Sequence, residues 1–474
     1  MADAALWTSK ELARATGGQC EAEWAVGGVS IDSRTVEAGD LFVALKGPNF
    51  DGHAFVKVAL DKGAAGAMVD ARPEGLPDNA PLLSLGDTMQ GLTDLGRAGR
   101  QRSQAKICAI TGSVGKTSTK EALRLALSRI GETHGSAASF NNHWGVPLSL
   151  ARMPQDSLYA VLELGMNHAG ELEPLSRLVR PHVAIVTNVE PVHLEFFDSV
   201  TEIARAKAEI FLGMEPGGVA ILNRDNAHFE LLRDSAMAAG ASRVVSFGAH
   251  SEADARLTGL AAHPTCNCIS ADICGQAVTY KVGAPGRHWA HNSLAVLAAV
   301  SVLEADLGLA ALSLADMSPL KGRGKRSKIR IDGDTFLLID DSYNASPASM
   351  RAALETLGTV QPGSRGRRVA VLGDMLELGD DAEELHASLV DEFVGNAIDL
   401  VFLCGPNMEA LYRILPGRIQ GLHVADSKAL QPHVLAAVRP GDVVLVKGSL
   451  GSRMEPIVTA LTDLGERPQN AVGQ

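Results

Sequence analysis

The sequence predicts an α/β protein of three domains: a small N-terminal α/β domain, a central domain with a parallel sheet and an antiparallel ribbon, and a C-terminal α/β domain. Its 474 residues are enough for about three domains of ordinary size. Apolar runs of strand length alternate with amphipathic runs of helix length, which is the pattern of parallel sheets covered by helices. A Gly-rich, basic segment at 318–328 interrupts the alternation and predicts a linker between two such patterns.

The N-terminal hundred residues predict a small sheet with helices. Thr8 is placed to cap a helix that runs through Ala15, and Asp51-Gly-His53 is a turn that opens a second helix. Short apolar runs predict strands at 29–34, 41–45 and 66–69. A polar helix at 89–104 leads out of this domain.

The central part predicts a parallel sheet. Strands are expected at 107–111, 159–164, 183–187 and 218–222, with helices near 116–130, 169–178, 201–213 and 226–239. Residues 243–283 change to short alternating runs, which predict an antiparallel ribbon before a helix at about 291–305.

The C-terminal part repeats the α/β alternation. Strands are expected at 336–340, 368–372, 400–403 and 443–447, with helices near 347–358, 380–394, 407–413 and 427–436.

Composition narrows the class of protein. Hydrophobic residues make up 46% and charged residues 21% of the chain, as in soluble globular proteins. The net charge of −12 argues against a general nucleic-acid binder. No run reaches 18 apolar residues, and the first ten residues lack the basic and apolar regions of a signal peptide. We therefore expect a cytoplasmic protein with no membrane span.

The cysteines leave one metal site to consider. The six cysteines lack the spacing of a disulfide framework. Cys266, Cys268 and Cys274 with His263 are a conceivable metal site. The alternating residues around them favour an exposed β-ribbon with reduced thiols.

An apolar run, a Gly-rich turn and a helix-like stretch follow one another between residues 105 and 123. The turn reads Thr111-Gly112-Ser113-Val114-Gly115-Lys116-Thr117, shorter than the common G-x-x-x-x-G-K-[ST] loop. Backbone N–H groups of such a turn, together with a helix N-terminus, bind phosphates. Lys116 can reach the outer phosphates and the Thr117 hydroxyl can bind Mg²⁺. The order of these parts favours a nucleotide site over an ordinary helix start.

Three further residues are candidates for the same site. Glu163 lies near the carboxyl end of a predicted buried strand, where a carboxylate suits Mg²⁺ unless it simply faces solvent. His193 follows the next strand and is either a metal ligand or a structural histidine. Lys207 lies on an amphipathic helix, where composition predicts an ordinary exposed charge.

Polar residues in the last third of the chain add a second ligand edge. Asn292 is near the first turn of a helix and either contacts a base or caps the helix. Arg323 lies in the predicted linker, free to contact a phosphate or remain solvated. Five polar residues at 340–344 stand at a strand end before Pro347, which favours a ligand edge over a generic turn.

Taken in order, these segments resemble the bacterial Mur ligases. The matching segments are 32–34, 41–47, 50–53, 111–117, 141–147, 163–168, 193–195, 207–211, 286–292, 340–344, 372–379 and 446–449. The segment from Asp340 to Pro347 is most similar to the member that adds D-Ala-D-Ala. The Asp-Asn-Pro-Arg signature of the sister ligase that adds the third residue is absent.

The resemblance implies a domain plan and a reaction. Residues 1–100 would bind a UDP-sugar, 101–325 would form the ATP-binding domain, and 326–474 a Rossmann-like domain that binds the dipeptide. ATP would phosphorylate the terminal carboxylate of UDP-MurNAc-tripeptide, and the amine of D-Ala-D-Ala would displace phosphate from the acyl phosphate. Such a protein serves peptidoglycan synthesis, and with it cell shape and division, and is expected to act as a monomer. The third peptide residue, lysine or diaminopimelate, stays open.

The resemblance also implies roles for single residues. ATP would be held by 111–117 and Lys116, with Asn292 on adenine, Asp341 on ribose and Arg323 on the transferring phosphate. Two Mg²⁺ ions are implied, one on Thr117 and Glu163, the other on His193 and a carbamylated Lys207. A free lysine amine is mostly protonated at neutral pH, so a carbamate needs a site that favours the neutral amine. The implied catalytic residues are Lys116, Lys207, His193 and Arg323, and the implied substrate residues are Ser33, Arg34, Lys46, Asp51, His53, Asn142, Tyr343 and Asn344.

Three alternatives remain at this stage. A sister Mur ligase would add a single amino acid instead of the dipeptide. A GTP-dependent switch is the alternative from another class, but it usually carries an Asn-Lys-x-Asp motif, and the nearest string, residues 223–226, does not match. A catalytically inactive scaffold is disfavoured because every proposed ligand position is filled.

Overall fold

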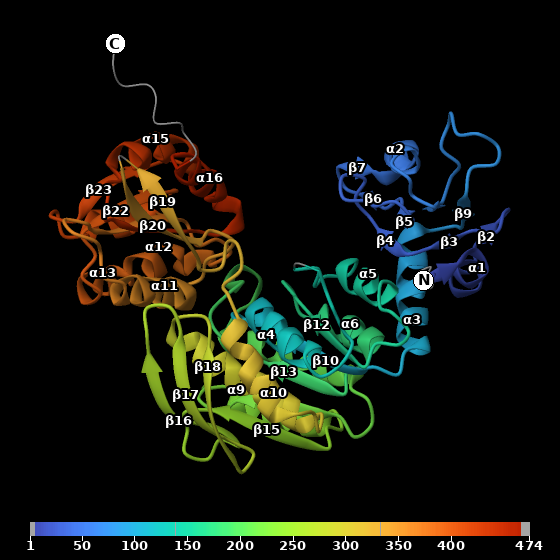
Figure 1. The fold of residues 1–474 in the computed structure, drawn as a ribbon, viewed down its shortest axis with the longest axis horizontal. Helices are drawn as coiled ribbons and strands as arrows, with labels where there is room; N and C mark the ends of the chain where they lie inside the picture. The colour runs from blue at the N-terminus through green and yellow to red at the C-terminus, as the bar shows by residue number, and fades with distance from the viewer. Residues whose placement is uncertain (1–4, 138, 332, 466–474) are drawn as a thin grey trace.

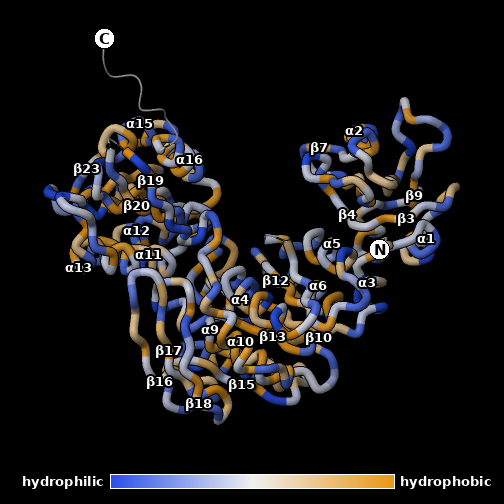
Figure 2. Tube along the Cα trace, viewed as in Figure 1, coloured by the Kyte–Doolittle hydropathy of each residue, from blue (hydrophilic) through white to orange (hydrophobic). Residues whose placement is uncertain are grey.

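The computed structural model describes residues 5–137, 139–331 and 333–465. Three α/β bodies follow one another along the chain, with the N-terminal and C-terminal bodies on either side of the central one (Figure 1). This is the fold class that the sequence predicts. Apolar and polar residues alternate along the trace of all three bodies (Figure 2). Among the described residues, no helix has both the length and the apolar character needed to cross a membrane.

The N-terminal domain is a five-stranded sheet with helices. The strand order is β2-β9-β8-β5-β4, and only the edge pair β2–β9 is antiparallel. The strands are β2 (Gln19–Cys20), β4 (Gly28–Ser30), β5 (Asp40–Val43), β8 (Gly66–Val69) and β9 (Leu82–Ser84), and the helices are α1 (Ser9–Thr16), α2 (Val56–Asp61) and α3 (Thr88–Arg102). The predicted Thr8 cap is confirmed, because its side chain accepts from the backbone N–H of Glu11 while the Glu11 carboxylate accepts from Thr8.

Close helix packing joins this domain to the central one. Helix α3 lies against α5 (Gly145–Ala151), and a Cβ at Gly99 would stand 2.2 Å from the carbonyl oxygen of Leu150. Trp7 donates from its indole to the carbonyl oxygen of Ala151 at 2.8 Å. The Arg102 guanidinium lies 3.4 Å from the centre of the Trp7 ring. These contacts hold α3 in place between the two domains.

The central domain is built on a nine-stranded sheet of order β11-β12-β10-β13-β14-β15-β16-β17-β18. Its strands are parallel from β11 to β16, and β16, β17 and β18 form an antiparallel meander. The strands are β10 (Lys106–Thr111), β11 (Thr133–Gly135), β12 (Tyr159–Glu163), β13 (Val183–Val186), β14 (Val219–Asn223), β15 (Arg243–Gly248), β16 (Ala255–Ala262), β17 (Asn267–Ile273) and β18 (Gln276–Val282). The predicted ribbon therefore begins later than expected. Strand β15 belongs to the parallel sheet, where its last four residues are buried.

Helices cover both faces of this sheet. Along β10, Cys108 and Ile110 face one hydrophobic core, while Ile107 and Ala109 face the other. The first core includes residues of α4 (Lys116–Ser128), α9 (Arg287–Val302) and α10 (Leu307–Ser313), and the second includes residues of α5, α6 (Leu172–Val179), α7 (Val200–Ala208) and α8 (Phe229–Ala238). Burial on both faces explains why these strands read as continuous apolar runs.

The C-terminal domain has a six-stranded sheet of order β19-β20-β24-β21-β22-β23, parallel except for the β19–β20 pair. The strands are β19 (Lys325–Ile331), β20 (Asp334–Asp341), β21 (Arg368–Gly373), β22 (Leu400–Cys404), β23 (Gln420–Val424) and β24 (Val443–Lys447), and the helices are α11 (Pro347–Thr359), α12 (Ala382–Ala387), α13 (Val390–Gly395), α14 (Met408–Ile414), α15 (Ser427–Ala437) and α16 (Glu455–Asp463). The predicted linker at 318–328 is wrong in its last part, since Lys325 already begins an edge strand.

Candidate active site

The phosphate loop lies between the end of β10 at Thr111 and the start of α4 at Lys116. Gly112 and Gly115 both have positive φ, at 145° and 85°. A Cβ at Gly112 would stand 2.0 Å from Oγ1 of Thr187, so only glycine fits there. The Thr187 hydroxyl donates to the carbonyl oxygen of Val114 at 2.6 Å. The end of the neighbouring strand thus fixes the loop, as a phosphate cradle requires.

The Lys116 ammonium folds back over its own loop. It donates to the carbonyl oxygens of Gly112, at 2.5 Å, and Ser113, at 3.4 Å. Burial lowers the pKa of this amine; nearby Glu163 opposes that shift and Arg323 adds to it. In this structure, the loop carbonyl oxygens accept the hydrogen bonds of the Lys116 ammonium. The oxygens of a bound phosphate would accept the same hydrogen bonds.

Thr117 and Glu163 meet as the sequence predicts. The hydroxyl of Thr117 donates to Oε2 of Glu163 at 2.8 Å, and the amide of Asn141 donates to Oε1 at 2.7 Å. Glu163 ends strand β12 and is 1% exposed. A hydroxyl and a carboxylate at the cavity are hard oxygen donors of the kind Mg²⁺ takes, so this pair fits the first predicted ion.

Lys207 is buried, which corrects the exposed charge that composition predicted. It lies on α7 and is 2% exposed. Burial, and then the charge of Lys116, hold the pKa of its amine well below the ordinary lysine value. Within residues 5–465 as described, its ammonium makes no hydrogen bond or ion pair. The lowered pKa favours the neutral amine that carbamate formation needs.

His193 sits in a turn next to this cavity, with a positive φ of 59°. Its Nδ1 lies 2.5 Å from Oε2 of Glu377, a residue of the C-terminal domain. The hydrogen bond from His193 lowers the pKa of the Glu377 carboxyl. In the described part of the chain, no hydrogen bond or ion pair joins His193 to Lys207.

Asn292 does not cap a helix, so that alternative is wrong. Helix α9 begins at Arg287, which places Asn292 inside the helix. Its amide packs against the phosphate loop, since a Cβ at Gly115 would stand 3.0 Å from Asn292 Nδ2. Asn292 therefore lies beside the phosphate loop and lines the same cavity.

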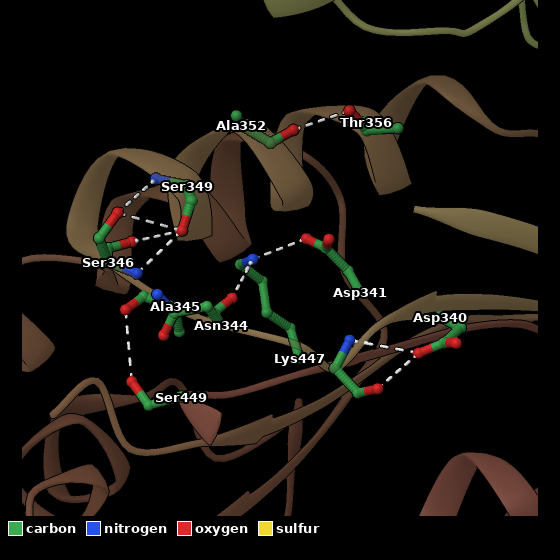
Figure 3. A network of polar contacts seen from close by, with 11 residues as sticks. Asp340, Asp341, Asn344, Ala345, Ser346, Ser349, Ala352, Thr356, Lys447 and Ser449 are labelled. Atoms are coloured by element: carbon green, nitrogen blue, oxygen red, sulfur yellow. Dashed lines mark hydrogen bonds and ion pairs between the residues drawn. The ribbon is translucent and has the colours of Figure 1, made fainter. Parts of the chain in front are cut away.

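The end of β20 lines the same cavity as the phosphate loop, and Figure 3 shows the polar contacts around this strand end. Lys447, the last residue of β24, donates to Oδ2 of Asp341 at 2.7 Å and to the carbonyl oxygen of Asn344 at 2.9 Å. Burial raises the pKa of the Asp341 carboxyl against the opposing effect of Lys447. Asp340 faces the other way and accepts from the backbone N–H of Gly322 and the hydroxyl of Ser342.

Arg323 lies between the central domain and the segment that follows β20, and it contacts both. Its guanidinium lies 4.2 Å from the centre of the Tyr343 ring, and Nη2 donates to the hydroxyl of Ser139 at 3.2 Å. Gly322, the preceding residue, accepts from the backbone N–H of Tyr343. Arg323 is therefore an ordered residue rather than a free charge on a linker.

A cavity of about 1020 Å³ brings these segments together. The predicted site residues that line it are Ser113, Val114, Gly115, Lys116, Thr117, Glu163, His193, Asn292, Arg323, Asp341, Tyr343 and Asn344. Thr111, Gly112, Asn142 and Lys207 do not line it, and neither do the predicted substrate residues of the N-terminal domain.

The N-terminal candidates form their own polar cluster. Lys46 pairs with Asp70 at 2.9 Å, and His53 Nε2 accepts from the backbone N–H of Asp70 at 3.1 Å. Asp51 accepts from His53 Nδ1 at 2.6 Å. The remaining candidates are held locally: Arg34 pairs with Asp32, the carbonyl oxygen of Ser33 accepts from Lys62, and Asn142 accepts from the backbone N–H of Gly145.

Sequence reasoning missed Lys447, Asn141 and Glu377 as site residues. Lys447 could have been predicted, because it ends a strand that runs parallel to β20. The ends of both strands therefore lie at the same edge of the sheet, which brings Lys447 next to Asp341. Glu377 had no local signal, since its contact with His193 spans 184 positions. Among the described residues, no group of three His, Cys, Asp or Glu side chains is placed to hold a metal, and this includes the cysteines near the ribbon.

Three domain families match the chain. They are described as the Mur ligase family catalytic domain, over residues 25–88, the Mur ligase middle domain, over 110–300, and the Mur ligase glutamate ligase domain, over 325–450. Together they cover most of the chain, in the order of its three bodies.

Curated relatives match over nearly the full length. The UDP-N-acetylmuramoyl-tripeptide–D-alanyl-D-alanine ligase of Escherichia coli is 37% identical over 92% of this chain and 94% of that relative. The ligase of the same name from Rickettsia prowazekii is 35% identical over 96% of this chain and 99% of the relative.

Solved structures agree with this match. MurF from Acinetobacter baumannii superposes with a TM-score of 0.82 at 31% identity, covering 97% of this chain and 99% of that chain. MurF ligase from Thermotoga maritima in complex with ADP gives 0.74 at 27% identity, over 93% and 98% of the two chains.

Proposed function

The chain belongs to the Mur ligase family, and from that premise we propose that it joins D-Ala-D-Ala to the terminal carboxylate of UDP-MurNAc-tripeptide. ATP is the energy source, and ADP and phosphate are the other products. One observation carries this most directly: a single cavity is lined by the phosphate loop on one side and by the Asp341–Asn344 strand end on the other. A nucleotide and the acid to be activated can therefore share one cavity.

The nucleotide side follows from the loop. The backbone N–H groups of 112–117 and the Lys116 ammonium bind the phosphates, and Lys116 exchanges its loop carbonyls for phosphate oxygens. Asn292 contacts the adenine and Asp341 the ribose. Arg323 is held on the Tyr343 ring at the cavity wall, where it can stabilise charge on the transferring phosphoryl group.

Two Mg²⁺ ions fit the donors that the chain presents. Thr117 and Glu163 would hold one ion, and His193 with a carbamylated Lys207 the other. The ions supply charge neutralisation for the phosphoryl group. The fit of Lys207 rests on its buried, unpaired amine, since a neutral amine attacks CO₂ and the carbamate so formed is an anion.

The steps then assign work to the chain's own residues. The substrate carboxylate displaces ADP from the γ-phosphoryl group, with Lys116 and Arg323 stabilising the added negative charge. The amine of D-Ala-D-Ala attacks the acyl carbon, and the tetrahedral intermediate expels phosphate as the amine loses a proton. Tyr343 and Asn344 lie on the wall that faces these groups. Closure around the cavity excludes water, which would otherwise hydrolyse the acyl phosphate.

We assign the domains accordingly. Residues 1–100 bind the UDP end through Ser33, Arg34, Lys46, Asp51 and His53, residues 101–325 bind ATP, with Asn142 on the substrate, and residues 326–474 bind the dipeptide. One chain supplies both walls of the cavity, which supports a monomer as the working unit. The need for ATP and a UDP-linked acceptor supports a cytoplasmic reaction.

A coupled phosphate assay tests the function. The protein is incubated with ATP, Mg²⁺ and UDP-MurNAc-tripeptide, and then with D-Ala-D-Ala or with single amino acids. We expect phosphate release only with the dipeptide. Release with a single amino acid alone would instead identify a sister ligase, and tight GTP binding without amine-dependent turnover would identify a nucleotide switch. Acceptors with lysine or diaminopimelate at the third position, run in parallel, decide that specificity.

A further inference from the structure

One turn of the central domain meets one turn of the C-terminal domain beside the cavity. His193 Nδ1 lies 2.5 Å from Oε2 of Glu377. The backbone N–H of Glu195 donates to the carbonyl oxygen of Glu377 at 3.3 Å. A Cβ at Gly379 would stand 3.4 Å from Cα of Glu195, so the two turns are in van der Waals contact.

The contact decides which nitrogen of His193 is available. An ionised carboxylate only accepts hydrogen bonds, so the proton between Glu377 and His193 belongs to Nδ1. In a neutral ring, Nε2 then keeps its lone pair. A histidine held in this way is the usual arrangement in metal sites, where a carboxylate on the other nitrogen sets tautomer and ring orientation.

We propose that Glu377 is a positioning residue that orients His193 for metal binding, so that the C-terminal domain completes a metal site of the central domain. The proposal rests on the assignment of His193 as a metal ligand in the proposed function. It adds a residue to the site and gives the site a dependence on the position of a second domain.

Glu377 is presented by a turn that its own domain holds firmly. The residue has a positive φ of 62°, as does a neighbour in the same turn, Gly379, at 63°. The backbone N–H of Met375 donates to Nε2 of His386 at 2.9 Å, and that of Leu376 donates to the Ser449 hydroxyl at 2.9 Å. Leu378 is 3% exposed. These contacts hold the backbone of the turn that presents the Glu377 carboxylate.

A linkage follows from this geometry. If docking of the C-terminal domain raises the affinity of His193 for a metal ion, then metal binding must favour docking by the same factor. The ion at His193 should therefore bind tightly only when the two turns are together, whereas the ion at Thr117 and Glu163 depends on the central domain alone.

Mn²⁺ binding to the full-length protein tests the proposal. Mn²⁺ is titrated with a non-hydrolysable ATP analogue present, and free Mn²⁺ is measured by electron paramagnetic resonance. We expect Glu377→Ala to weaken one of two bound ions by about 10- to 100-fold and to leave the other unchanged. Glu377→Gln should weaken it less, because the amide oxygen still accepts from Nδ1. Asp380→Ala removes an exposed acid three positions away and should change neither ion.

Two further variants interpret the result. His193→Ala should weaken the same ion, and adding Glu377→Ala to it should have no further effect, because Glu377 acts through the histidine. Unchanged Mn²⁺ binding in Glu377→Ala, with wild-type thermal unfolding, would overturn the proposal. Unchanged binding in His193→Ala would refute the metal assignment, and the positioning role with it. Failure of the dipeptide assay in a protein that still shows the Glu377 effect would overturn only the proposed function.

Discussion

At the scale of single residues, the site depends on amines and carboxylates removed from water. Lys207 is 2% exposed and unpaired within the described residues, whereas Glu163 at 1% exposure accepts from both Thr117 and Asn141. The two donors satisfy both oxygens of the Glu163 carboxylate. Burial holds the pKa of the Lys207 amine well below the ordinary lysine value, which favours the neutral form of the amine.

Lys116→Ala should abolish turnover and leave the fold intact. Among the described residues, the ammonium hydrogen-bonds only to two backbone carbonyl oxygens of its own loop, so its loss breaks no side-chain contact between elements. The bound phosphates lose their nearest cation, and we expect phosphate release to fall by at least ~100-fold. The coupled phosphate assay measures this, with circular dichroism as the check on folding. Release near the wild-type rate would show that the loop does not bind ATP.

Lys207→Ala should be nearly inactive, because the proposed carbamate is lost with the amine. Carbon-13 NMR of protein in ¹³C-labelled bicarbonate should show a carbamate signal in the wild type and none in the variant. Lys106→Ala removes an exposed lysine at the start of β10 and serves as the control that keeps the signal. An active Lys207→Ala protein would exclude the carbamate role.

At the scale of elements, helices α3 and α5 pack closely because α3 has a glycine, Gly99, where it meets the backbone of α5. Gly99→Ala places a methyl group 2.2 Å from the Leu150 carbonyl oxygen. Ala normally stabilises a helix relative to Gly, but here overpacking should destabilise the protein by about 1–3 kcal/mol. Gly395→Ala in α13 is the matched control, because a Cβ at Gly395 would have no atom of another part of the protein within 4 Å. Urea unfolding midpoints measure both, and equal midpoints would contradict the predicted clash.

His134 makes the β11–α5 contact sensitive to acid. Its Nε2 donates to the Ser149 carbonyl oxygen at 2.7 Å, and burial lowers the pKa of the ring from 6.5 to about 4. Between these values the unfolded chain binds a proton that the folded chain does not, so the free energy of unfolding falls as pH decreases. His134→Gln should reduce the loss of stability between pH 7.5 and pH 5. Identical losses of unfolding free energy in the two proteins, measured by urea unfolding, would contradict this. The pKa values of His182 and His288 are also lowered, and both residues are present in both proteins, so they do not account for a difference.

The elements that sequence predicts well are those whose pattern is local. Strands such as β10 and β13 are buried on both faces and appear as apolar runs. The first part of strand β19 was taken for a linker because this is an edge strand with exposed basic residues, such as Lys325 and Lys328. The ribbon was expected to start at 243 because β15 and β16 are both short strands, of six and eight residues, and sequence does not show that β15 pairs in parallel.

The candidate site divides in the same way. The phosphate loop could be predicted because strand, glycines, lysine and helix stand side by side in the sequence. Lys207 could not be placed from composition, since its burial comes from how α7 packs against the sheet. The partners Glu377 and Ser139 depend on contacts between segments about 184 positions apart, which no local pattern records.

At the scale of the whole molecule, the ligand contacts are distributed over separate regions. The cavity of about 1020 Å³ is lined by the central and C-terminal domains only. The Lys46, Asp51 and His53 cluster lies on the N-terminal domain, outside that lining. A substrate that reaches both must be long, with its UDP end at the cluster and its reacting carboxylate in the cavity.

Because of this separation, the UDP end of the substrate contributes binding energy at a place far from the reacting carboxylate. An acceptor peptide that lacks UDP presents the same carboxylate but cannot use the N-terminal cluster, so kcat/KM in the phosphate assay should fall by at least ~100-fold. Lys46→Ala should lower kcat/KM for the full acceptor by about 10-fold, the effect of a lost charged hydrogen bond. The same variant should leave the truncated acceptor unchanged, because that acceptor never reaches Lys46. Equal losses with both acceptors would mean that Lys46 acts on the fold or on the cavity, and the N-terminal cluster would then not be the UDP site.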